Sequence, residues 1–220
     1  MVKQQRALRT RGALLRAAAE VFDEQGYGGA SFTQICKRVG ISMGALTYHF
    51  STKDDLVAAI RAEGRAATAS TVERVVSGAL PPLCAAVELT LAVTDLLAAD
   101  AAVRATARLS RERPALEPAW ASLWAEPLGD LIRRAGAGRG LRAGVDPDTV
   151  TALAFHLVTG AETVLCHDRH HHGTAPDSST TRELARIWQL ILPGIAAVPC
   201  VQHAPHNGGT PLARRSENLS

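Results

Sequence analysis

Apolar residues recur at the helical spacing of three and four positions through most of this 220-residue chain. One stripe consists of Leu15, Ala18, Ala19 and Phe22, and a longer stripe covers residues 150–165. The composition agrees, because 64 Ala and Leu residues stand against 23 Val and Ile residues, and β-branched residues favour strands. The sequence therefore predicts an all-α protein of about nine helices.

The positive charge is concentrated at the start of the chain. Residues 1–53 carry a net charge of +5 and the remaining residues a net charge of −2. A small basic module followed by a larger, nearly neutral helical module is typical of a polyanion-binding head on a body with another task. A basic terminus that is merely solvated gives the same charge pattern.

Other features indicate a globular protein of the cytoplasm. The cysteines are scattered without a CxxC pair, which favours reduced thiols over a disulfide framework or a zinc site; they are Cys36, Cys84, Cys166 and Cys200. We expect no membrane partner, because no apolar run reaches the roughly 18 residues of a membrane span. Arg16 interrupts the N-terminal segment before a signal-peptide core can form. We expect no cofactor.

Two short predicted helices flank a glycine in the first quarter of the chain. A long helix over about residues 4–25 precedes them, Ser31 caps the first short helix, and Gly40 separates it from a second that Ser42 caps. This outline is typical of a helix-turn-helix unit. The second short helix begins with small residues, which allow a close approach of its backbone to a surface; an ordinary helical hairpin remains the alternative.

Longer helices are expected after residue 51. The predicted ranges are about 52–77, 82–99, 100–111, 115–136 with a kink or break at Pro127, 147–165 and 180–195. Ser51 and Asp54 have capping-box spacing at the first of these helices. We predict three segments: a helix-turn-helix domain over 1–51, a ligand-binding and dimerisation domain over 52–198, and a flexible tail over 199–220.

The stretch from Thr10 to Leu56 resembles the DNA-binding domain of the TetR family of transcriptional repressors. The matching elements are Gly26-Tyr27, Gly40-Ile41-Ser42, Gly44-Ala45-Leu46, His49-Phe50 and Lys53-Asp54. The resemblance implies a homodimer that places two copies of the 42–50 helix in successive major grooves of a near-palindromic operator.

The same resemblance implies roles for particular residues. Base-edge contacts would come from Ser42, Met43, Gly44 and Ala45. Phosphate contacts would come from Thr33, Thr47, Tyr48, His49 and Lys53. Arg6, Arg9 and Arg11 would reach the DNA from an extended arm.

Residues 110–165 resemble the ligand-binding domain of the γ-butyrolactone and furan autoregulator receptors of actinomycetes. That resemblance implies a small, largely apolar effector in a pocket with Trp120 in its wall. Further expected lining residues are Leu91, Thr94, Leu123, Trp124, Phe155, Thr159 and Glu162. It also implies a dimer interface on the helices at 147–165 and 180–195, where we place Trp188.

Two readings from other classes stay open. The first is a dimeric interaction or ligand-sensing protein with weakened or lost DNA binding. The second is a metal-dependent enzyme using the run from His167 to His172, although no HExxH motif or GxSxG elbow accompanies that run. We therefore predict neither catalytic residues nor a metal site.

Two positions depart from the families named. The γ-butyrolactone receptors usually have Lys where this chain has Met43, and the wider family usually has Tyr where it has Thr47. We expect Met43→Lys to strengthen DNA binding and to change operator preference, because it restores a cation near the phosphates. Gel shifts of both proteins on a panel of operators at two salt concentrations test this; unchanged affinity and choice would contradict it.

Overall fold

The computed structural model describes residues 2–114, 118–172 and 179–200, with side chains described from Thr10 to Cys166 in these ranges and again from Ser179. Over these residues the fold is all-α, as predicted. The helices are α1 (Val2–Gly29), α2 (Phe32–Val39), α3 (Met43–His49), α4 (Lys53–Val76), α5 (Pro82–Ala99), α6 (Ala101–Glu112), α7 (Ser122–Ala137), α8 (Pro147–His172) and α9 (Ser179–Ile195).

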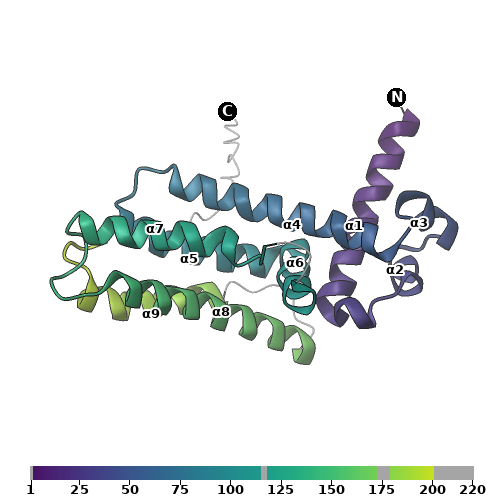
Figure 1. The fold of residues 1–220 in the computed structure, drawn as a ribbon. Coiled ribbons are helices and arrows are strands. Elements are labelled where there is room, and N and C mark those ends of the chain that lie inside the picture. The colour runs from purple at the N-terminus through teal and green to yellow at the C-terminus, as the bar shows by residue number, and fades with distance from the viewer. Residues whose placement is uncertain (1, 115–117, 173–178, 201–220) are drawn as a thin grey trace, which may run out of the picture.

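The helices form a small head and a larger body (Figure 1). Helices α2 and α3 lie at one end beside α1, and α4 runs from them along the body. The body consists of α4, α5 and α7–α9, and α6 lies between it and α1, against which it packs.

The apolar core of the head extends past residue 51. Phe22 of α1, Ile35 of α2 and Leu46 of α3 belong to one buried cluster with Leu56 of α4 and Leu109 of α6. The short helices α2 and α3 cannot bury enough apolar surface alone. The position of the head therefore depends on two helices that also belong to the body.

Caps fix the ends of the short helices. The Ser31 hydroxyl accepts from the Gln34 N–H and the Gln34 side chain accepts from the Ser31 N–H, which is a full capping box. Gly40 has φ +74°, so the turn into α3 requires the left-handed conformation that glycine tolerates.

Some predicted helix limits were wrong. The N-cap of α4 is Thr52 with Asp55 as its partner, one residue later than the expected pair. Helix α1 is kinked at Gly26 and continues to Gly29. Helix α7 begins at Ser122 and passes through Pro127 without a break in its helical assignment.

Two helices contradict the expectation that no segment is long and apolar enough to cross a membrane. Pro82–Ala99 and Pro147–Cys166 both qualify by length and composition. More than half of the first is buried, which is typical of a central core helix, whereas most of the second is not. Each span contains two acidic residues, Glu88 and Asp95 in the first and Asp148 and Glu162 in the second.

The expectation of reduced thiols was wrong for one pair of cysteines. Cys84, near the start of α5, and Cys200, after α9, form a disulfide with Cα atoms 5.5 Å apart. The two residues are 116 positions apart in the sequence, so only the folded arrangement of α5 and α9 reveals the pair. Cys36 and Cys166 are not joined in a disulfide.

Gly64 allows α4 and α6 to pack closely. A Cβ atom at this position would lie 2.5 Å from the Ala102 carbonyl oxygen, which belongs to the backbone and cannot move aside cheaply. We expect Gly64→Ala to lower the free energy of unfolding by about 1–3 kcal/mol. Urea unfolding followed by circular dichroism measures this, and Gly12→Ala in α1 is the matched control. Equal stability of the Gly64 and Gly12 variants would refute the close contact.

Candidate DNA-reading and effector sites

The outer face of α3 is exposed at the tip of the head (Figure 1). Ser42, Met43, Gly44 and Thr47 are exposed, and 84% of Tyr48 is accessible. On the opposite side Leu46 is fully buried and fixes the rotation of the helix. Ala45 and His49 are partly buried.

Two hydroxyl groups on the exposed face of α3 form different hydrogen bonds. The Ser42 oxygen accepts from the Ala45 N–H at 3.3 Å, which leaves the Ser42 O–H able to donate to a base or a phosphate. The Thr47 hydroxyl donates to the Met43 carbonyl at 3.1 Å within the helix. Only an oxygen lone pair of Thr47 is then left for a further partner, and phosphate oxygens do not donate. In this rotamer Thr47 is a poor phosphate contact.

The structure gives Lys53 a structural role that was not predicted. Its ammonium donates to the backbone carbonyls of Tyr27 and Ala30, the latter at 2.6 Å. Two of the three N–H groups are therefore used inside the head. Its assignment as a main phosphate contact is not supported by this arrangement.

The expected extended arm is wrong for the described residues, because helix α1 begins at Val2 and includes Arg6, Arg9 and Arg11. Of these three, Arg11 has a described side chain, whose guanidinium carbon lies 5.2 Å from the centre of the Phe50 ring. Arg11 is exposed. These arginines therefore extend from a helix and not from a free segment.

Lys37 is an exposed basic residue of the head that was not among the predicted DNA contacts. Lys37 lies one helical turn after Thr33 in α2, and both are exposed. Residues four positions apart share one side of a helix, so the predicted contact at Thr33 also pointed to Lys37. The neighbouring Arg38 instead forms an ion pair with Glu24 at 2.9 Å.

A buried ion pair joins the head to α6. Arg104 Nε donates to Asp23 Oδ2 at 2.5 Å, and both side chains are less than 10% exposed. Arg104 also donates to the Leu97 and Ala98 carbonyls at the end of α5. Arg108 donates to the Asp23 carbonyl at 2.6 Å. Helix α6 is thus bonded both to α1 and to the body.

Three of the predicted effector residues form an aromatic cluster in the body core. The Trp120 and Trp124 rings meet edge to face at 6.0 Å, and Trp124 stacks on Phe155 at 5.4 Å. Trp120 Nε1 donates to the Thr68 hydroxyl at 2.9 Å. Trp124 Nε1 is buried and has no hydrogen-bond partner among the described residues.

Other predicted effector residues have different positions. Leu91 packs partly buried against the body core, and Thr94 is buried with its hydroxyl donating to the Thr90 carbonyl at 2.8 Å. Glu162 forms an ion pair with Arg111, and Thr159 is exposed on α8. Thr159 lies about one turn after Phe155 in α8 and Glu162 about two turns after it, so both are displaced along the helix from the aromatic cluster.

Trp188 was wrongly placed at the dimer interface. It is 1% exposed, and its Nε1 donates to the Thr90 hydroxyl on α5 at 2.8 Å. The hydrogen bond and the burial both lie within one chain. The apolar periodicity of α9 around Trp188 is typical of a core-facing side as well as of a dimer interface.

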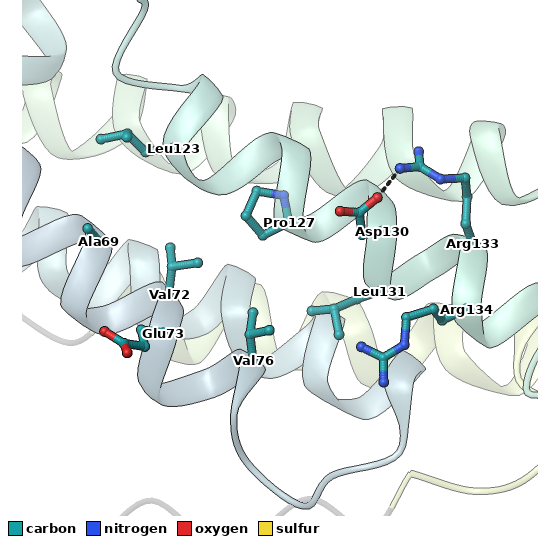
Figure 2. Close-up of a pocket in the computed structure, with 10 residues that line it drawn as sticks. All are labelled: Ala69, Val72, Glu73, Val76, Leu123, Pro127, Asp130, Leu131, Arg133 and Arg134. Carbon is teal, nitrogen blue, oxygen red and sulfur yellow. Dashed lines mark hydrogen bonds and ion pairs between the residues drawn. The ribbon is translucent and has the colours of Figure 1, made fainter.

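An open cleft of about 580 Å³ lies between α4 and α7 (Figure 2). Its lining residues are Ala69, Val72, Glu73, Val76, Leu123, Pro127, Asp130, Leu131, Arg133 and Arg134. Of these lining residues, Leu123 was also predicted to line the effector pocket. Asp130 and Arg133 form an ion pair at the edge of the cleft. The cleft and the aromatic cluster thus differ in position, since Trp120, Trp124 and Phe155 do not line the cleft.

Comparison with known proteins finds a family match in the first part of the chain and relatives that are similar over most of its length. Residues 14–60 match the family described as "Bacterial regulatory proteins, tetR family". The sequence is 29% identical to the A-factor receptor protein of Streptomyces griseus, over 98% of this chain and 74% of that protein.

Solved structures agree with this result. A γ-butyrolactone receptor described as ArpA-like has 25% identity and a TM-score of 0.69, covering 88% of this chain and 91% of that one. CprB from Streptomyces coelicolor, solved with its operator sequence, has 26% identity and a TM-score of 0.65 over the same shares. Residues 14–60 thus match the TetR family of regulatory proteins, and most of the chain is similar to γ-butyrolactone receptors, relatives that are transcriptional regulators and not enzymes.

Proposed function

We propose that this protein is a homodimeric repressor in the cytoplasm that leaves a palindromic operator when a small, largely apolar effector binds. A γ-butyrolactone, a butenolide or a furan fits this description. The observation that carries the proposal is the exposed face of α3 on a head whose core is shared with the body.

The reading surface has both kinds of contact that operator binding needs. Met43 and Ala45 offer apolar groups for a thymine methyl, and the Ser42 hydroxyl offers a donor. Tyr48, Thr33 and Lys37 are exposed beside them and supply phosphate contacts. Because α3 is held by Leu46 in the core, these groups keep a fixed relation to one another.

The unpaired indole N–H of Trp124 supports an effector site in the aromatic cluster. A buried donor without a partner costs about 1–3 kcal/mol. The other two tryptophans avoid this cost, because each donates to a threonine hydroxyl. A carbonyl or ring oxygen on an apolar effector would satisfy the Trp124 N–H while its carbon atoms replace part of the packing against Phe155.

An effector bound at the aromatic cluster would act on the head through α4 and α6. Trp120 is bonded through its side chain to Thr68 of α4 and through its backbone N–H to Ser110 of α6. Helices α4 and α6 both contribute to the core of the head. Effector binding that favours a different packing of the cluster therefore favours a different position of α3.

The outer face of α8 and α9 supports the proposed dimer interface. Val164 of α8 is 44% exposed and Leu190 of α9 is 82% exposed. Exposed apolar side chains on adjacent helices are typical of a surface that a second subunit covers.

Gel shifts against the upstream region of its own gene test DNA binding. We expect a palindrome-specific shift that weakens with salt, because bound phosphates release counterions. We expect Lys37→Gln to weaken binding to all sequences and to reduce the salt slope by about 1 per subunit. Arg74→Gln, at an exposed arginine in the last turn of α4, away from the head, is the control. Absence of any specific shift at low salt would favour the interaction protein without DNA binding.

Trp124→Phe tests the effector site. We expect the variant to fold and to bind the operator, but to bind lactone and furan effectors about tenfold more weakly, because it lacks the N–H and keeps most of the ring area. A thermal-shift screen of these compounds, followed by calorimetry, measures the difference. Trp188→Phe is the control for loss of an indole N–H elsewhere in the core. Equal effector affinity in Trp124→Phe and the parent would place the site elsewhere.

A further inference from the structure

The ring of Tyr27 lies close to two cations from different helices. Lys53 Nζ, from the first turn of α4, is 4.4 Å from the ring centre. The guanidinium carbon of Arg113, the residue that ends α6, is 4.2 Å from it. Both distances are within the range of cation–π attraction.

Hydrogen bonds also connect Tyr27 to residues of α4 and to residues at the end of α6. The Tyr27 hydroxyl donates to Asp54 Oδ1 at 3.0 Å, and Arg113 donates to the same oxygen at 2.5 Å. These two bonds hold the pKa of Asp54 below its usual range. The Tyr27 backbone N–H donates to Glu112 Oε2 at 2.7 Å. Tyr27 is therefore bonded at its ring, its hydroxyl and its backbone to α4 and α6.

Tyr27 stands where the chain changes direction. It follows Gly26, whose φ of +68° kinks α1, and it precedes Ser31, the N-cap of α2. Lys53 fixes the same turn by donating to the carbonyls of Tyr27 and Ala30. A rotation of Tyr27 about the end of α1 would therefore rotate α2 and α3 relative to α4 and α6.

We propose that Tyr27, Lys53, Asp54 and Arg113 form a clamp that sets the angle of α3 relative to the body, and hence the half-site spacing that the dimer accepts. This inference rests on the proposed operator binding. All four are positioning residues, and their expected effect on DNA operates through α3. A cluster that only stabilised the fold would weaken binding equally at every operator spacing.

Arg113→Gln tests the clamp because it removes the cation and the ion pair while leaving a polar, unbranched side chain. Arg111→Gln is the matched control, since Arg111 lies two residues earlier and forms its ion pair with Glu162 of α8. Arg113→Lys keeps a cation near the ring and is the rescue variant. Each full-length protein is measured on operators whose half-sites are moved apart or together by one and two base pairs.

We expect Arg113→Gln to reduce the preference for the best spacing by about two- to fivefold per subunit, the range set by an exposed cation–π contact. Arg111→Gln retains the preference and Arg113→Lys restores part of it. Equal weakening at all spacings, or no change, overturns the proposal.

Amide hydrogen exchange of the free protein gives a second readout without DNA. We expect amides of α2 and α3 to exchange two- to fivefold faster in Arg113→Gln, with α5, α7 and α9 unchanged and Arg111→Gln like the parent. Parental exchange in α2 and α3 of Arg113→Gln would overturn the clamp. If no operator binds, the proposed function fails, and the exchange measurement still decides the clamp.

Discussion

The buried ion pair between Asp23 and Arg104 is the constraint on which the arrangement of head and body depends. Charges removed from water are tolerated only when they are paired and hydrogen-bonded. Arg104 meets this condition by bonding to Asp23 and to two carbonyls at the end of α5. Because separating the two buried charges would leave both unpaired, the pair holds α1 in its register on α6.

This arrangement places the two sites at opposite sides of a shared pair of helices. The exposed face of α3 lies beyond α4 and α6, and the aromatic cluster around Trp124 lies within the body. Helix α6 bonds to α1 through Arg104 and to Trp120 through Ser110. Helix α6 therefore links the head to the aromatic cluster of the body.

The sequence predicted the position of α3 and its small, exposed first residues, whereas the assigned DNA contacts and effector contacts stay predictions. Residues of α3 were predictable because a glycine turn and two serine caps act over a few positions. The ion pair of Glu162 and the exposure of Thr159 were not predictable, because helical spacing shows that residues share a face but not which element that face meets. The hydrogen bonds of Lys53 were not predictable for a similar reason, since its partners are backbone carbonyls that carry no sequence signal.

The sequence by itself determined the all-α class, most helix limits, the basic head and the exposed start of α3, because caps, turns and apolar periodicity are local properties of the chain. Tertiary structure alone decided the Cys84–Cys200 disulfide, the Asp23–Arg104 pair, the burial of Trp188 and the unpaired N–H of Trp124. Each of these depends on atoms from segments that are distant in sequence, and only the packing of the helices brings such atoms within bonding distance.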